Sequence, residues 1–219
     1  MVVKTVSTPE ATADAVREMI LNGELEPGTR LRETQFAERL GVARHSFRAA
    51  TQILIGEGLL RREPNRGVTV PVLDPEDIVD IFRVRAALEL EAIRIVIADG
   101  SNLTAASAAA DELSALPDDA SWRSVVEPDM RFHQAIIDAT ASERMIRAYA
   151  AVQSEIELCM VQLRPHYDRP EQVAKEHREL LEPLVGADVD EADRLFRVHL
   201  DDAARNLTSA FETRASVVP

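Results

Sequence analysis

The chain has 219 residues, of which 46% are hydrophobic and only 4% aromatic. This length allows one large domain or two small ones, and the aliphatic composition favours a core of packed helices over a β-sandwich. The formal net charge of −13, taken over the whole chain, argues against a nucleic-acid binder, because DNA is itself a polyanion.

The charge is unevenly distributed along the chain, which changes that conclusion. Residues 1–73 hold 10 Lys and Arg against 9 Asp and Glu, a net charge of +1, whereas the remaining residues have a net charge of −14. Two parts of different electrostatic character predict two domains, 1–73 and 74–219, with separate functions.

The sequence also indicates the environment of the protein. Its single cysteine, Cys159, excludes an intrachain disulfide. The first residues lack the apolar segment of a signal peptide, and no apolar run is long enough to cross a membrane. We therefore expect a cytoplasmic protein without a membrane partner.

Three short helices and a hairpin are predicted in the first domain. Apolar residues recur at helical spacing over 9–21, 32–40 and 44–56, and Gly41 ends the second of these helices. Two β-prone runs then flank Pro64-Asn65-Arg66-Gly67, as in a hairpin turn. Two helices joined by a glycine turn and followed by a hairpin are typical of the winged helix-turn-helix, a DNA-binding fold.

The third predicted helix and the hairpin tip carry the side chains that we expect to contact DNA. In this fold the start of the third helix faces base edges in the major groove, where the planar fork of arginine pairs with guanine. A hairpin tip can approach the backbone or the minor groove. Surface arginines alone would mean little, but the order of the elements makes the pattern specific. The candidate residues are Arg44, His45, Ser46, Arg48, Arg66 and Gly67.

The same segments resemble the DNA-binding domain of the GntR family of regulators. The resemblance rests on Leu25–Glu33, Leu40–Ala50, Gly58–Arg62 and Pro64–Gly67, and it covers nearly all of residues 8 to 71. It implies that DNA is contacted by Arg44 and Arg48, with smaller contacts from His45 and Ser46 and a wing glycine at Gly67.

The second domain is predicted to be an antiparallel bundle of six helices, so that the whole chain is mainly α. Asp74-Pro75 is a typical helix start. Glycines, prolines and short polar stretches separate the helical segments, and short loops favour antiparallel neighbours. The expected helices cover 75–99, 103–115, 119–140, 142–164, 170–185 and 188–214.

Four side chains of this bundle could bind one metal ion. Asp129 and His133 lie four residues apart, on one face of a helix, and His177 and His199 lie on the last two helices. One carboxylate and three imidazoles suit Zn²⁺, Ni²⁺, Mn²⁺ or Fe²⁺. Spacing alone leaves the alternative open that these are three ordinary, partly buried histidines.

The bundle resembles the FCD effector domain of the FadR-type branch of GntR regulators, and its six helices resemble the smaller VanR-like subgroup. The match spans about residues 78 to 204. It implies that Asp129, His133, His177 and His199 are metal ligands. The matching segments are Val84–Glu89, Asp129–His133, Glu176–Leu181, Asp190–Asp193 and His199–Leu200.

Arg85 matches an arginine that is common in the first FCD helix. It could bind the carboxylate of an effector bidentately, or it could pair with Glu89 one turn later, which would contribute only about 0.3–0.5 kcal/mol in an exposed pair. The sequence thus predicts a transcriptional regulator, in the repressor class, that binds a pseudo-palindromic DNA operator as a homodimer. A small organic acid bound at the metal and Arg85 would modulate operator binding.

Two alternatives for the bundle stay open at this point. It could be a structural and dimerisation module, with a structural metal or none. It could also be a metal-dependent hydrolase that uses a metal-bound water, although the sequence offers no obvious separate general base and we expect no enzyme activity.

Overall fold

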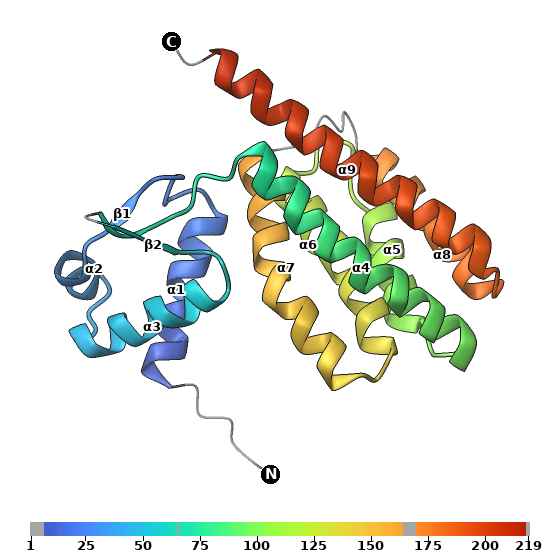
Figure 1. The fold of residues 1–219 in the computed structure, drawn as a ribbon, viewed down its shortest axis with the longest axis horizontal. Coiled ribbons are helices and arrows are strands. Elements are labelled where there is room, and N and C mark those ends of the chain that lie inside the picture. The colour runs from blue at the N-terminus through green and yellow to red at the C-terminus, as the bar shows by residue number, and fades with distance from the viewer. Residues whose placement is uncertain (1–6, 65, 164–169, 218–219) are drawn as a thin grey trace. The chain divides into compact units, whose positions relative to one another are not determined.

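The structure is a computed structural model that describes residues 7–64, 66–163 and 170–217 (Figure 1). The chain divides into two compact units, Met1–Leu73 and Asp74–Pro219. Both are mainly helical, which confirms the predicted fold class.

Three helices form the body of the N-terminal unit. The first begins at Ser7, whose hydroxyl accepts a hydrogen bond from the Glu10 backbone while the Glu10 carboxylate accepts one from the Ser7 backbone, a reciprocal cap. The buried rings of Phe36 and Phe47 stack with centroids 5.9 Å apart, and this contact holds the second helix against the third. The helices are α1 (Thr8–Leu21), α2 (Glu33–Arg39) and α3 (Arg44–Gly56).

A small antiparallel sheet completes this unit. The predicted hairpin is present as β2 (Arg61–Glu63) and β3 (Gly67–Thr69). A third strand, β1 (Arg30–Leu31), was not predicted; it pairs with β3 and gives the order β1-β3-β2. Two residues are too few to show an alternating pattern. Asn65, which we named as part of the wing turn, lies outside the described residues.

In its described residues the C-terminal unit holds the six expected helices. The first of them begins with a reciprocal cap between Asp74 and Asp77 and ends at Gly100, which has a left-handed conformation (φ +60°). The helices are α4 (Pro75–Asp99), α5 (Thr104–Ser114), α6 (Trp122–Ala139), α7 (Glu143–Leu163), α8 (Pro170–Val185) and α9 (Val189–Val217).

Helix α4 is central to the packing of this bundle. It contacts α6, α7, α8 and α9, and it runs beside α9 for most of its length (Figure 1). Ile93, Phe132, Ile136 and Phe196 are fully buried and fill the core. Inward side chains of α4 therefore meet those of four other helices, which makes the inside of the bundle the place where distant polar residues can converge. None of the helices, over the residues searched, is long and apolar enough to span a bilayer.

Candidate metal centre and nucleic-acid interface

The predicted DNA-contacting side chains lie at the start of α3 and in the hairpin. Arg44, His45 and Arg48 are exposed, as helix residues that read a groove must be. Ser46 differs, since only 5% of its surface is exposed in the unbound chain. It turns toward the interior beside Phe47, and it therefore has the least surface of the four to offer a phosphate.

The wing residues are held by contacts within the hairpin. Arg66 is exposed, and its Nη1 donates a hydrogen bond to Oε2 of Glu63 at 3.0 Å. The other oxygen of Glu63 accepts a hydrogen bond from the Thr69 hydroxyl at 3.0 Å. Gly67 has a φ of +85°, a conformation that glycine adopts without the strain that a Cβ would impose. This conformation lets the chain turn sharply where Arg66 is presented.

The three histidines predicted as metal ligands come together inside the bundle. His133 from α6, His177 from α8 and His199 from α9 have ring centroids 5.1–5.3 Å apart. One ligand nitrogen from each ring lies within 4.8 Å of the others. Two nitrogens on one Zn²⁺ are at most about 4.2 Å apart, so a small inward movement would bring all three into coordination.

Hydrogen bonds fix which nitrogen of two rings faces the centre. His133 Nδ1 lies 2.7 Å from Oε2 of Glu89, and His177 Nδ1 lies 2.8 Å from the Val173 carbonyl. Both partners are acceptors, so each Nδ1 carries a proton, and in the neutral ring Nε2 then carries a lone pair. Both Nε2 atoms are buried without a hydrogen-bond partner. Such a pattern fits a metal ion, because ligand imidazoles commonly donate their second nitrogen to a carboxylate or carbonyl.

Asp129 lies beside this triad. Its Oδ1 is 3.0 Å from His177 Nε2, and its Oδ2 is buried without a hydrogen-bond partner. A carboxylate oxygen facing an imidazole lone pair requires a proton or a cation between them. Burial lowers the pKa of His177, but Asp129 outweighs it and the pKa is raised. The residues present therefore fit a divalent cation, which would replace that proton.

Electrostatics differ among the imidazoles. Burial lowers the pKa of His133 to about 4, although Glu89 opposes this shift. Burial also lowers the pKa of His199, whose Nδ1 lies 3.7 Å from the Glu176 carboxylate. At neutral pH both of these rings are uncharged, which is the form that binds a metal.

Glu89 organises the layer behind the candidate metal ligands, a role that was not predicted from the sequence. Its Oε1 accepts hydrogen bonds from Arg85 Nε at 2.7 Å and from the Tyr149 hydroxyl at 2.9 Å, while Oε2 contacts His133. The four-residue spacing predicts that Arg85 pairs with Glu89, weakly if both side chains are exposed. The pair is present, but both side chains are 1% exposed, because α4 is enclosed by its neighbours.

Arg85 keeps one nitrogen for another partner. Its Nη2 is buried and makes no hydrogen bond. One small cavity is lined by Arg85, Asp129 and His199, together with Trp122 and Met160. The centre of a water-sized sphere can occupy about 10 Å³ of it. That is about the space for one water molecule. The cavity thus places the buried guanidinium of Arg85 beside two of the candidate metal ligands, Asp129 and His199.

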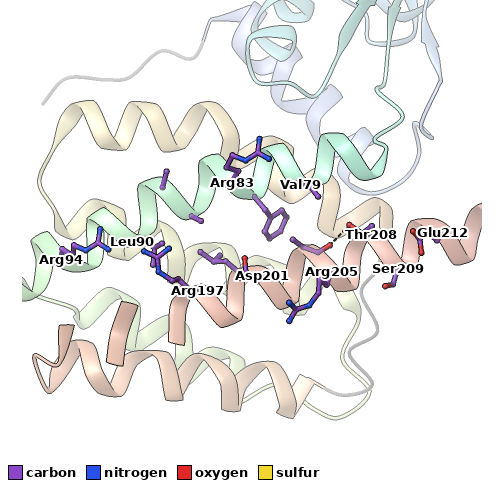
Figure 2. Close-up of a pocket in the computed structure, with 15 residues that line it drawn as sticks. Val79, Arg83, Leu90, Arg94, Arg197, Asp201, Arg205, Thr208, Ser209 and Glu212 are labelled. Carbon is purple, nitrogen blue, oxygen red and sulfur yellow. Dashed lines mark hydrogen bonds between the residues drawn. The ribbon is translucent and has the colours of Figure 1, made fainter. Parts of the chain in front are cut away.

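A wider groove of about 840 Å³ lies between α4 and α9 (Figure 2), and no histidine is among the residues that line it. Its four arginines each pair with a nearby carboxylate: Arg83 with Asp80, Arg94 and Arg197 with Asp193, and Arg205 with Asp202. Despite its size, this groove lacks the unsatisfied buried polar atoms of the inner cavity. We therefore place the ligand chemistry at the inner cavity.

One change tests the role of Glu89. In Glu89→Gln the amide cannot neutralise Arg85 or accept hydrogen bonds as strongly, so we expect metal affinity to fall about 10–100-fold, as for other partners of metal ligands. Leaving Arg85 without its buried partner is also expected to cost about 3–5 kcal/mol of folding stability. Metal titration and urea unfolding measure the two effects.

Tyr149→Phe is the matched control, because it removes one neutral donor to the same carboxylate. We expect it to cost about 1 kcal/mol of stability and to leave metal affinity nearly unchanged. A Glu89→Gln protein that binds metal as tightly as the wild type would show that Glu89 does not support His133.

Comparison with known proteins identifies both units. Residues 8–70 match the model of bacterial regulatory proteins of the gntR family, and residues 80–202 match the FCD domain. An uncharacterized HTH-type transcriptional regulator, YdhC of Bacillus subtilis (strain 168), is 26% identical over 200 residues, which cover 90% of this chain and 89% of that protein. The "Probable D-xylose utilization operon transcriptional repressor" of Paenarthrobacter nicotinovorans is 24% identical, with 88% and 87% covered.

Solved structures show the same architecture. A GntR chain from Rhodococcus sp. RHA1 superposes with a TM-score of 0.78 at 26% identity, covering 92% of this chain and 98% of that one. McbR/YncC of E. coli superposes with a TM-score of 0.77 at 18% identity, covering 94% and 100%, which shows the fold alone. The relatives are transcriptional regulators and not enzymes, so the hydrolase alternative falls away. The chain belongs to the GntR family of transcriptional regulators and carries an FCD domain.

Proposed function

We propose that this regulator is a repressor whose operator binding is controlled by a small organic acid bound at a metal ion in the FCD domain. The observation that carries the proposal is the convergence of three imidazoles and Asp129 beside the unpaired Nη2 of Arg85. Buried polar atoms without partners are rare and call for an explanation, which is commonly an ion or a ligand.

The metal would be held by His133, His177, His199 and Asp129. Such a donor set suits Zn²⁺, Ni²⁺, Mn²⁺ or Fe²⁺, and a metal that accepts five or six ligands keeps positions for a carboxylate. When bound, the metal supplies positive charge in an otherwise acidic domain. Arg85 would take a second oxygen of the effector through Nη2, while Glu89 holds its Nε.

The size of the inner cavity links effector binding to a change in the bundle. A sugar acid, hydroxy acid or dicarboxylate is larger than the single water for which the cavity has room. The Trp122 side chain, which donates a hydrogen bond to the Met160 carbonyl at 2.8 Å, lines this cavity and would have to move with its helix. An effector that binds the expanded bundle more tightly shifts the protein toward that form, and the operator affinity changes with it.

On the DNA side, we propose that Arg44 and Arg48 read base edges, with His45 and Ser46 in supporting contacts and Arg66 and Gly67 at the wing. A homodimer would place two such units on the half-sites of a pseudo-palindromic operator. Acting on DNA, the protein would work in the cytoplasm. The assignment as a repressor is supported by the relative that is named a transcriptional repressor.

A ligand screen tests the effector. Metal-loaded protein is heated with sugar acids, hydroxy acids or dicarboxylates, each paired with its neutral amide. We expect at least one acid to raise the unfolding temperature and change the affinity for operator DNA, and its amide to do neither. Acids that leave both quantities unchanged on fully loaded protein would leave the metal with a structural role only.

A further inference from the structure

A two-point ion pair joins the first residue of α2 to the start of α3. Glu33 Oε2 accepts a hydrogen bond from Arg48 Nε at 3.1 Å, and Glu33 Oε1 accepts one from Arg48 Nη2 at 2.8 Å. These contacts occupy one edge of the guanidinium. The distal edge, formed by Nη1 and the second N–H of Nη2, keeps its pair of parallel donors.

Folding stability does not account for this pair. The Arg48 side chain is 67% exposed and that of Glu33 is 35% exposed. Water screens such pairs, and two long side chains lose freedom when they form, so their contribution to stability is small. Arg17 and Glu57, by contrast, are only 25% and 26% exposed and join α1 to the end of α3.

The Glu33 carboxylate also lies beside α3, where a negative charge repels the phosphates of DNA. The hydrogen bond from Arg48 lowers the pKa of Glu33, which therefore stays ionised at neutral pH. Residues 1–73 carry a net charge of only +1, a sum that includes Glu33, so this single negative charge beside α3 is as large as the net charge of the whole unit. It weakens attraction to any phosphate backbone, whatever the base sequence.

We propose that Glu33 is a positioning residue that makes Arg48 selective for a base over the phosphate backbone. Glu33 restrains the guanidinium so that a single pair of donors faces the groove, a geometry that matches the two acceptors of guanine. Its charge at the same time disfavours phosphate contacts by the same arginine. The inference rests on the proposed reading role of Arg48.

Glu33→Gln separates these effects from size, because glutamine is nearly isosteric and uncharged. With Arg48 free to reach phosphates, we expect binding to unrelated DNA to tighten and its log–log salt slope to steepen by about 0.9, the value for one added phosphate contact. The ratio of operator affinity to unrelated-DNA affinity should fall about tenfold, within the discrimination that one bidentate base contact supplies.

The experiment uses the full-length, metal-loaded protein and an operator obtained by selecting bound duplexes from a randomised library. Fluorescence anisotropy gives both affinities across a salt series, and thermal unfolding gives stability. Glu24→Gln is the matched control, because it makes the same charge change in the same unit at a carboxylate 3.5 Å from Arg39. We expect Glu24→Gln to keep the affinity ratio and Glu33→Gln to lower it without changing the unfolding temperature.

Two outcomes overturn different statements. Suppose that Glu33→Gln and Glu24→Gln have the same ratio of operator affinity to unrelated-DNA affinity, while Arg48→Ala loses operator binding. The inference about Glu33 is then wrong and the role of Arg48 stands. If Arg48→Ala binds the operator like the wild type, the reading role of Arg48 is wrong as well. When bound duplexes are selected with the Glu33→Gln protein, the base preference should weaken at the same operator position at which it weakens with Arg48→Ala.

Discussion

Replacing His177 with alanine is expected to abolish metal binding. The variant loses one of three converging imidazoles and the group that faces Asp129 at 3.0 Å. Loss of a partner behind a metal ligand already costs about 10–100-fold in affinity, so loss of a ligand should cost more than 100-fold. Protein stripped with a chelator and titrated with Ni²⁺ or Zn²⁺ gives the affinity, and elemental analysis after dialysis gives the stoichiometry.

The thermal response provides an independent measurement. Metal at about 1,000 times its dissociation constant should stabilise the wild type by about 4 kcal/mol, and the same concentration should leave His177→Ala unchanged. Comparing each protein with and without metal removes the cost of the substitution itself. His45→Ala, which removes an exposed imidazole of the other unit, should respond like the wild type. Equal metal affinity in His177→Ala and His45→Ala would show that His177 is not part of a metal centre.

Replacing Arg44 or Arg48 with alanine is expected to remove specific operator binding. Each arginine is exposed at the start of α3, and a bidentate contact to a base contributes about 1–3 kcal/mol of discrimination. The N-terminal unit has only a slight net charge, so a broad basic surface cannot substitute for these two side chains. Competition between operator and unrelated DNA, at fixed salt, measures the loss.

The control for these variants is Arg194→Ala, which removes the positive charge of one exposed arginine in the C-terminal unit. It should bind the operator like the wild type. Operator affinities of Arg44→Ala and Arg48→Ala that both match this control would show that α3 is not the recognition helix, and the wing would then be the next element to test.

Local patterns were sufficient to predict most of the fold. The expected bounds of α3, α4 and α8 are those of the structure, because start and stop signals act within about one turn of the chain. The strand β1 was missed because its only support is pairing with β3, nearly forty residues away in the sequence. Most other helix ends differ by a few residues from the expected ones, as at the start of α6, which was expected at residue 119 although Ser121 caps the helix.

The proposed metal ligands and their surroundings differed in how far the sequence could identify them. Spacing placed Asp129 and His133 on one face and allowed His177 and His199 to converge with them, and the family resemblance favoured a metal site over three ordinary histidines. The role of Glu89 was missed because its partners His133 and Tyr149 lie 44 and 60 residues away. The useful signal was present in the four-residue spacing of Arg85 and Glu89, and recognising that both are buried would have required knowing which helices enclose α4.

The pairing of β3 with both β2 and β1 limits how the regulator can adapt to altered binding sites. Because β1 leads directly into α2, and α2 packs on α3 through Phe36 and Phe47, the hairpin is connected through β1 to the proposed recognition helix. We expect the pairing of β3 with β1 to resist an outward swing of the hairpin toward a displaced groove. A base pair inserted within a half-site should therefore be tolerated poorly, since either the helix contacts or the hairpin contacts must be given up.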